Sequence, residues 1–528
     1  MPASWLLMPL PSSRGERARM RGSQRHEQPW VVPAALLALA ALVGPLDPIS
    51  SLPTPVRIVA WIVALGLAWL AVVRWFDLQG LTRWNVFILV ASYVFYGNYN
   101  WHFVGLLAIS TIANQVFTTN IDRNEEERKR KAWLILAVTL NLGVLGWFKY
   151  KGFFIESGSS LFSPLGIDIV PPARAIIPPV GISFFTFQAL SYVIDTYRRK
   201  LHPVPLLEFA VYLSFFPHLV AGPIVRASEF LPQLRVPRDV RRLDTGLAFW
   251  LIAAGMFKKV VVSSYLASAS VDPVFRLPSQ HDAGDTLVGI YAYAIQIYCD
   301  FSGYTDMAIG LALLLGFRFP QNFDAPYTSA SLQEFWRRWH MTLSRWLRDY
   351  VYIPLGGNQR GTNRAILNVF LTMVIGGLWH GAAWTFVVWG AIHGTALAAE
   401  RVWADRPKRE GARQWSPTAQ LWFGRFLTFQ IVCLGWVFFR APTLTDAFHV
   451  LGRLLHPGLG KGGINLLVVA IIATFILTQY VPSKAVSQAQ AVFSRMAVWQ
   501  QGTLLALSLA FTSALAPVGV APFIYFAF

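Results

Sequence analysis

The sequence has few charged residues for its length. Asp, Glu, Lys and Arg make up 14% of its 528 residues, whereas a soluble globular chain has about 25%. Hydrophobic residues account for 55%, and the mean hydropathy is +0.45. This composition excludes an ordinary soluble enzyme. It favours one integral-membrane domain over residues 30–528, in contact with membrane lipids.

Acidic residues are scarcer still, with 27 Asp and Glu against 45 Lys and Arg. In a soluble chain that excess would suggest a nucleic-acid partner. Here the basic residues lie in loops between apolar runs, which is how cytoplasmic Lys and Arg orient a membrane protein, so no nucleic acid is expected. Residues 1–29 are predicted to be a disordered basic tail on the cytoplasmic side, or to include residues before a true start at Met20.

Cysteine and several common catalytic motifs are also lacking. Cys299 and Cys433 are far apart and form no CxxC, which leaves a disulfide framework or a cysteine zinc site without support. No basic residue flanks Cys299, so a nucleophilic role is not expected. The chain has no Gly-rich phosphate loop, HExxH or GxSxG, so NTPase, zinc-protease and α/β-hydrolase functions are unsupported.

Long apolar runs are what the sequence has in abundance. A spanning helix needs about 20 mostly apolar residues, and the runs predict an all-α polytopic membrane protein with about eleven to thirteen membrane segments. These runs are Trp30–Leu46, Ile58–Val73, Trp84–Ile121, Ala132–Phe148, Ala175–Ile194, Phe209–Val225, Thr245–Val271, Thr286–Phe317, Ala365–Ala399, Leu421–Phe439, Gly462–Ser483 and Met496–Phe528.

Loop charges refine this topology. Basic loops flank Phe209–Val225 on both sides, which predicts a re-entrant hairpin buried in protein, where non-helical backbone is tolerated. The positive-inside rule also requires two spans within Trp84–Ile121. It requires Ala365–Ala399 to enter the membrane and return.

His380 is the most conspicuous polar residue at membrane depth, where ionisable groups are costly and commonly functional. It is placed near the turning point of Ala365–Ala399, beside several glycines. Burial there disfavours the imidazolium and leaves a neutral nitrogen that accepts a proton. A structural histidine bonded between helices is the alternative, which this pattern alone does not exclude. His393 and His218 are expected to be structural.

Glu334–Tyr350 is predicted to form one amphipathic helix at the cytoplasmic interface. Its polar face would carry Arg337, Arg338, Arg345 and Arg348, suited either to anionic lipid or to a phosphate-bearing substrate. The pattern alone favours lipid anchoring, which leaves only His340 unexplained. The apolar arc holds Trp336, Trp339, His340, Leu343, Trp346, Leu347 and Tyr350.

Asp300 and Asp306 lie in a third polar segment of an apolar run. Two nearby carboxylates suit acid–base chemistry. A buried network in which they satisfy one another and nearby Arg is the favoured interpretation.

Several ordered motifs together resemble those of bacterial membrane-bound O-acyltransferases, and most of all the branch of alginate O-acetyltransferase membrane subunits. The resemblance covers about residues 84–528. The motifs that carry it are Pro179–Gln188, Phe215–Ile224, Ile297–Asp306, Phe335–His340 running to Tyr352–Gly357, Gly377–Trp384 and Phe523–Phe528.

The resemblance implies residue roles and a fold. It implies that His380 is the essential histidine of the family and that His340 is the second family histidine. The fold implied is a helical body with a thinned centre, where a funnel and a tunnel meet at the histidine. Weaker expectations for substrate binding fall on Arg337, Arg338, Trp339, Trp379, Asp300 and Tyr304.

The function implied by the resemblance is transfer of an acetyl group across the bacterial inner (cytoplasmic) membrane. Acetyl-CoA would be the co-substrate, and neither a metal nor another cofactor is expected. The acceptor would be an exported, alginate-like polysaccharide, or a periplasmic SGNH-like acetyltransferase that relays the group. Two alternatives remain: D-alanyl transfer from a carrier protein to a cell-envelope polymer, and a non-enzymatic transporter or flippase. A transporter would predict inverted repeats, and none is visible in the sequence.

Overall fold

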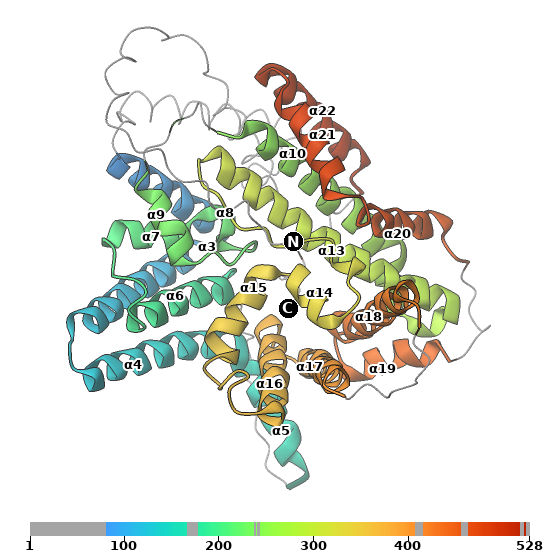
Figure 1. The fold of residues 1–528 in the computed structure, drawn as a ribbon, viewed down its shortest axis with the longest axis horizontal. Coiled ribbons are helices and arrows are strands. Elements are labelled where there is room, and N and C mark those ends of the chain that lie inside the picture. Colours follow the sequence, from blue (N-terminus) through green and yellow to red (C-terminus); the bar gives the residue numbers. More distant parts are fainter. Residues whose placement is uncertain are drawn as a thin grey trace.

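The computed structural model describes residues 81–165, 178–236, 239, 243–406, 415–455, 463–517 and 522–523. Helices dominate these residues, and no β-strand occurs among them. The N-terminal helices lie on one side of the body, the C-terminal helices lie on the other, and α13 to α17 fill the centre (Figure 1). The prediction of an all-α membrane protein is confirmed.

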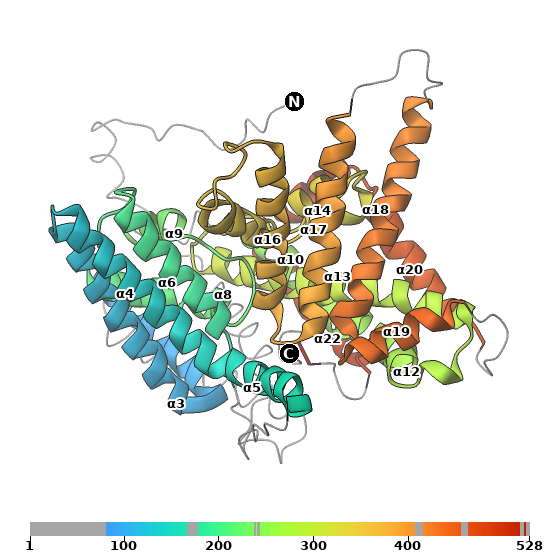
Figure 2. The same ribbon diagram turned by 90° about the horizontal axis from the view of Figure 1, so that it is seen from below.

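On the N-terminal side, α3, α4 and α6 lie obliquely beside one another (Figure 2). α3 breaks at Asn100, whose φ and ψ are −162° and 110°, so two helical segments meet within the run Trp84–Ile121. α4 continues through the π-helical turn η1 into α5. The elements of this side are α3 Leu81–Arg123, α4 Glu127–Leu145, η1 Gly146–Tyr150, α5 Lys151–Phe162, η2 Ser163–Leu165, α6 Ile182–Tyr197, α7 Leu206–Ser214, α8 Phe216–Leu219 and α9 Ala227–Leu234.

α13, Ala283–Leu314, crosses the middle of the molecule (Figure 1). It packs closely against α10, because a Cβ on Gly303 would lie 2.7 Å from the carbonyl oxygen of Gly255. The helix that begins with α10 contains two π-helical stretches and runs without a break to Arg276. Its parts are α10 Thr245–Met256, η4 Phe257–Ser263, α11 Ser264–Leu266, η5 Ala267–Val271 and α12 Asp272–Arg276, followed by η6 Pro278–Gln280.

The C-terminal part begins with short helices and continues into a helical hairpin. Glu400 of α17 accepts hydrogen bonds from the backbone N–H groups of Leu332 and Gln333 at 2.6 and 3.1 Å, which ties the start of α14 to the hairpin. The elements are η7 Pro326–Thr328, α14 Leu332–Arg338, α15 Met341–Leu347, η8 Arg348–Tyr352, α16 Thr362–His380, α17 Trp384–Ala404, α18 Pro417–Arg440, α19 Leu444–Arg453, α20 Leu466–Thr478, α21 Ser483–Ser494 and α22 Val498–Leu515.

Four helices in the described residues are long and apolar enough to cross a membrane, or up to five if a bent pair forms one span. The eleven to thirteen membrane segments predicted also include runs outside the described residues, and several of the others fold as short or broken helices. Pro178, Pro179 and the left-handed Gly181 delay α6 until Ile182, and α20 and α21 meet at 92°. The four helices are Trp84–Arg123, Glu127–Phe162, Thr245–Arg276 and Pro417–Arg440.

Two segments fold in the form that the loop charges predict, as short helices and as a hairpin, while their placement in the membrane stays a prediction. Phe209–Val225 contains only the short helices α7 and α8, of 9 and 4 residues, and residues 209–219 are all buried. Neither helix reaches the length of about 20 residues that a span needs. Ala365–Ala399 folds as the hairpin of α16 and α17. The predictions for residues 1–29 and for the runs Trp30–Leu46 and Ile58–Val73 lie outside the described residues.

Candidate active site

His380 is the last residue of α16 and lies at the turn of the hairpin, as predicted. Glycines let the two helices approach. Cβ atoms on Gly377 and Gly390 would lie 2.2 Å from the Phe386 carbonyl oxygen and 2.5 Å from that of Met373. Because the contacts pair later residues of α16 with earlier residues of α17, the helices are antiparallel. A Cβ on Gly381 would lie 2.0 Å from the Phe386 ring, so a larger residue directly after the histidine would displace that ring.

Aromatic rings enclose the imidazole of His380, whose exposed fraction is 4%. Its ring centroid lies 4.9 Å from that of Trp379, 5.0 Å from Trp389 and 5.2 Å from Phe439. All three rings meet it nearly edge to face, at 71–83°. These aromatic neighbours exclude water from the imidazole, and an apolar environment favours its neutral form.

His340 interrupts the amphipathic helix, so the prediction of one continuous helix over Glu334–Tyr350 is wrong. The structure has α14, a break at Trp339–His340, and then α15 and η8. The backbone of His340 is left-handed, with φ +42° and ψ +53°, a strained conformation for a residue with a Cβ. Two backbone hydrogen bonds to the preceding loop hold it there: Met341 N–H donates to the Asn322 carbonyl, and Asp324 N–H donates to that of Arg338.

The prediction that the apolar arc of this region faces the protein and that the arginine-rich arc faces outward is nonetheless confirmed. Trp339, His340, Leu343, Trp346, Leu347 and Tyr350 are buried, whereas Trp336 is only partly buried. Arg337 and Arg348 on the opposite side are exposed.

The hydrogen-bond network around Asn322 defines the tautomer of His340. Nδ1 of His340 lies 3.2 Å from Oδ1 of Asn322. The backbone N–H and the hydroxyl of Thr342 donate to the same oxygen at 3.1 and 2.9 Å, and that hydroxyl oxygen accepts from Ile224 N–H. Because Oδ1 is thereby an acceptor, Nδ1 must carry the proton. The lone pair of a neutral His340 is then on Nε2, which is buried and has no hydrogen-bond partner among the described residues.

Trp379 connects the two histidines. Its ring centroid lies 4.9 Å from that of His380 and 6.1 Å from that of His340. Phe187 of α6 stacks on Trp379 at 5.2 Å and on Trp346 at 3.6 Å. The structure therefore brings His380, His340 and Trp379 together, and Trp339 lies among the surrounding aromatic rings, 5.0 Å from Phe323.

Asp300 and Asp306 form two buried or partly buried ion pairs, but with Lys rather than with Arg. Lys259 donates to Asp300, and Lys258 donates to Asp306 at 2.5 Å. These are the two lysines that interrupt the apolar run Thr245–Val271. Tyr304, on the same helix, packs with its ring 4.9 Å from Phe523. None of these contacts involves His380, and substrate binding by Asp300 and Tyr304 stays a prediction.

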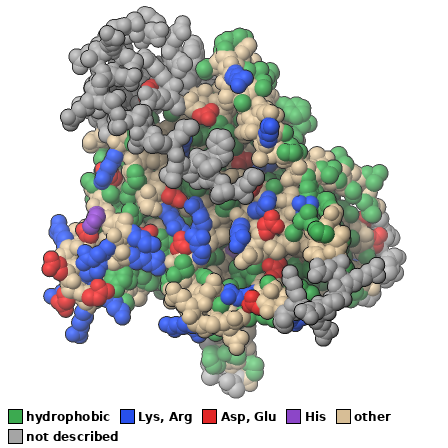
Figure 3. Space-filling view, in the orientation of Figure 1, with side chains coloured by type: hydrophobic (Ala, Val, Ile, Leu, Met, Phe, Trp, Pro, Cys, Tyr) green, Lys and Arg blue, Asp and Glu red, His purple; other side chains and the backbone are tan. Residues whose placement is uncertain are grey.

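The basic residues expected to meet a substrate phosphate are mostly paired with carboxylates. Arg338 pairs with Glu334, Arg345 with Glu229, and Arg348 with Asp349. Arg337 forms no ion pair in the part of the chain that the structure describes. Lys and Arg side chains gather across the middle of this face, over α9, α14 and α15, among acidic side chains (Figure 3).

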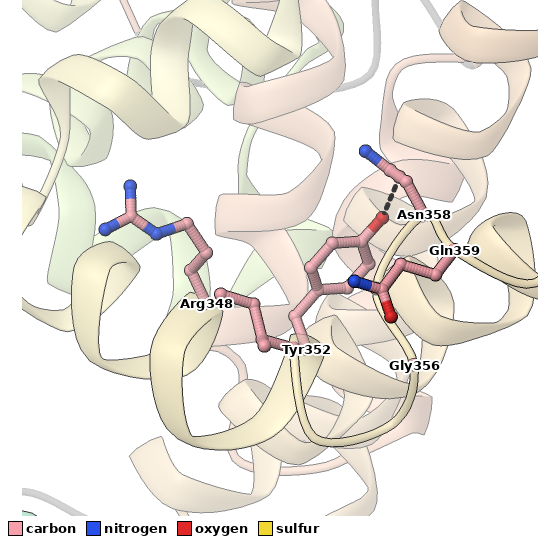
Figure 4. A pocket seen from close by; sticks show the side chains of 7 residues that line it. Arg348, Tyr352, Gly356, Asn358 and Gln359 are labelled. Atoms are coloured by element: carbon pink, nitrogen blue, oxygen red, sulfur yellow. Dashed lines mark hydrogen bonds between the residues drawn. The ribbon is translucent and has the colours of Figure 1, made fainter. Parts of the chain in front are cut away.

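Two hollows lie beside this basic region. One, of about 370 Å³, is formed by Arg348–Gln359; Figure 4 shows Arg348 and Tyr352 on its wall, with the Tyr352 hydroxyl bonded to Asn358. The other, of about 150 Å³, lies between α15, η8 and the hairpin, where Leu347 faces Thr372 and Met373. Both hollows share Arg348 and Tyr352.

Two further buried histidines, His218 and His393, lie among aromatic rings. Nε2 of His218 lies 3.0 Å from the carbonyl oxygen of Tyr212. His393 packs among aromatic rings, with Trp389 at 4.9 Å and Trp336 at 5.3 Å. Within the described residues, no group of three or more His, Cys, Asp or Glu side chains is arranged to hold a metal ion.

Sequence reasoning missed Asn322 and Lys149. Asn322 stands in a loop 18 residues before His340, and no sequence pattern marks it as a partner. Lys149 directly follows the apolar run Ala132–Phe148, and no sequence pattern marks it as part of the site. The structure continues the helix to Phe162 and directs Lys149 to the carbonyl oxygens of Trp379 and His380.

The described residues form an all-helical membrane protein with a buried histidine at the turn of a glycine-packed hairpin. The family model of the membrane-bound O-acyltransferases (MBOAT) matches residues 101–440. The chain is 39% identical to the probable alginate O-acetylase AlgI of Pseudomonas putida, over 72% of this chain and 76% of the relative. It is 34% identical to a peptidoglycan O-acetyltransferase of Helicobacter pylori, over 72% and 75%. It is 31% identical to a teichoic acid D-alanyltransferase of Streptococcus thermophilus, over 50% and 69%.

The chain therefore belongs to the membrane-bound O-acyltransferase family, and it is an integral membrane enzyme that transfers acyl groups to oxygen. This removes the transporter or flippase alternative.

Proposed function

We propose that this enzyme takes an acetyl group from acetyl-CoA on the cytoplasmic side of the bacterial inner membrane and passes it across the membrane for O-acetylation of an exported, alginate-like polysaccharide. The observation that carries the proposal is the position of His380, buried in aromatic rings at the hairpin turn and sharing Trp379 with His340. The names of the alginate O-acetylase and peptidoglycan O-acetyltransferase relatives support acetyl as the group transferred.

His380 acts as the general base. A hydroxyl is a weak nucleophile, and a positioned base removes its proton as the oxygen attacks the thioester carbonyl. The new C–O bond forms, the C–S bond breaks, and the proton held by His380 passes to the departing CoA thiolate. The edge-to-face rings of Trp379, Trp389 and Phe439 support this role, because they keep the imidazole neutral and exclude competing water.

His340 orients the donor rather than polarising its carbonyl. Polarising a carbonyl needs an N–H directed at its oxygen, but the hydrogen bond to Asn322 holds the proton on Nδ1. Nε2 is left as an acceptor for an N–H or O–H of the bound substrates. The amide nitrogen of Asn322 is also buried and without a partner among the described residues, and it offers two further donors.

The donor approaches through the two hollows that share Arg348 and Tyr352. The smaller hollow reaches Met373 of α16, and His380 lies seven residues further along the same helix, about 10 Å at 1.5 Å per residue. Arg337 lines neither hollow, but it is exposed and forms no ion pair within the described residues, so we expect its guanidinium to meet a donor phosphate at the protein surface.

The acceptor is either the polysaccharide itself or a relay residue on a periplasmic SGNH-like partner. The second candidate function is D-alanyl transfer from a carrier protein, favoured by the similarity to a teichoic acid D-alanyltransferase. Acetyl transfer is preferred because the acetyltransferase relatives match more of the chain at higher identity.

The test uses proteoliposomes holding the purified enzyme, with labelled acetyl-CoA outside and either alginate-type polysaccharide or the SGNH-like partner inside. We expect CoA release that depends on the luminal component and label that becomes ester-linked to it. In a parallel arm, D-alanyl carrier protein replaces acetyl-CoA. Transfer from the carrier protein, with none from acetyl-CoA under any acceptor condition, would overturn the acetyl proposal.

A further inference from the structure

The C-terminal end of α16 lies inside the protein, where its carbonyl groups need partners. The last four carbonyls of any α-helix have no partner within the helix, and at membrane depth water does not supply one. Here all four have partners. Gly377 accepts from Gly381 N–H at 3.3 Å, and Leu378 accepts from the Tyr150 hydroxyl at 2.6 Å. Trp379 and His380 both accept from Nζ of Lys149, at 2.6 and 3.0 Å.

The geometry points to Lys149 as a positioning residue for His380, an ammonium cap that fixes the end of α16 for acyl transfer; this inference rests on the proposed function. An ammonium has three donors, and Lys149 directs them to the two carbonyls and to Ser183 Oγ at 3.2 Å. Because all three donors are engaged within the protein, Lys149 has none left for the substrate, and it acts through the backbone of His380.

The local backbone explains how two adjacent residues reach the same helix end. Lys149 and Tyr150 lie in η1, where the helix from α4 to α5 widens into a π-helical turn. A π-turn changes the register of side chains on a helix, and such turns recur at functional sites. The cation at the negative end of the α16 dipole is also favourable electrostatically. The cap joins residues 231 positions apart in the sequence.

The consequence is kinetic. A misplacement of about 1 Å at a reacting group costs on the order of a hundredfold in rate, and Lys149 holds the carbonyl oxygen of His380 itself. Lys149→Met, which keeps the length of the side chain and removes its donors, is expected to lower kcat by about 10- to 100-fold with little change in KM for the donor.

Three variants accompany Lys149→Met. Lys149→Arg restores a cation with several donors and is expected to recover part of kcat. Tyr150→Phe removes only the bond to Leu378 and is expected to lower kcat by a smaller factor. Lys151→Met is the matched control: its ammonium lies 3.9 Å from the Trp147 ring centroid rather than at the end of α16, and near wild-type kcat is expected.

A readout independent of activity is hydrogen exchange of the peptide that covers Leu378–Trp384. Faster exchange is expected in folded Lys149→Met and not in Lys151→Met. If Lys149→Met does not fold, the inference is tested with Tyr150→Phe, by its kcat and by hydrogen exchange of the same peptide. Wild-type kcat and wild-type exchange in the folded cap variants would overturn the inference. If the wild-type enzyme transferred no acetyl group, the proposed function would be contradicted instead. The hydrogen-exchange rates of the variants would then still test whether Lys149 fixes the end of α16.

Discussion

Nδ1 of His340 lies 3.2 Å from Oδ1 of Asn322, an oxygen that also accepts two hydrogen bonds from Thr342. This relationship assigns the ring proton to Nδ1 and leaves Nε2 as a buried acceptor. It also holds the left-handed backbone of His340 against the preceding loop that contains Asn322. The side-chain amide of Asn322 therefore fixes both the orientation of the His340 ring and the nitrogen that carries its proton.

Asn322→Leu should lower kcat by about tenfold or more. It leaves the Nδ1–H of His340 without its hydrogen-bond partner, at a cost of about 1–3 kcal/mol, so that neither the tautomer nor the orientation of the imidazole is fixed. Steady-state kinetics on purified protein checks this. Asn141→Leu is the matched control, since Asn141 is also buried and hydrogen-bonded, to Asn114 in the N-terminal helices. Equal losses in the two variants would show that the effect is one of general stability.

Arg337→Gln should raise KM for acetyl-CoA several-fold and leave KM for acetyl-pantetheine unchanged, because only the former carries the nucleotide phosphates. The effect should weaken at high salt. Arg338→Gln should change KM less, because Glu334 already engages its guanidinium at 2.8 Å. An equal rise in KM for both donors would contradict a phosphate contact at Arg337.

Asp300→Asn should destabilise the protein by about 3–5 kcal/mol, because it leaves Lys259 buried without its charged partner. The double variant Lys259→Met with Asp300→Leu should recover most of the stability and the activity. Thermal unfolding and kcat measured on the same preparations test this. A stable but inactive double variant would show that the pair takes part in the chemistry.

Asp349 should make the η8 segment sensitive to acid. Partial burial opposes its ionisation, but hydrogen bonds from Arg348 and Arg226 dominate and hold its pKa below the usual range. The ion pairs are therefore fully present above the ordinary pKa of about 3.9 and are lost as the pH falls through the depressed value. Proteolysis of wild-type protein within 348–359 should accelerate below about pH 4. The Asp349→Asn variant should be cleaved at neutral pH as fast as the wild type is at acid pH. A pH-independent rate in both would contradict this.

The sequence predicts the parts of this site that follow from local pattern. Apolar periodicity places His340 and its aromatic neighbours on the buried side, and loop charges place His380 at a hairpin turn. The break at His340 could not be predicted, because it depends on hydrogen bonds from a loop 18 residues away. Lys149 looks like the boundary of an apolar run until the fold brings α16 against it. Asp300 was expected to meet Arg, because local pattern does not show which cation of a neighbouring helix lies opposite.

The most direct test of the account compares CoA release by wild-type protein, His380→Phe and His393→Phe in the same proteoliposomes. Both substitutions place a ring of similar size in an aromatic setting, but only His380 is the proposed base. We predict that CoA release by His380→Phe is at least about a hundredfold slower than by wild type, while CoA release by His393→Phe stays close to the wild-type rate. Equal CoA release by His380→Phe and wild type would remove His380 from the chemistry and contradict the account.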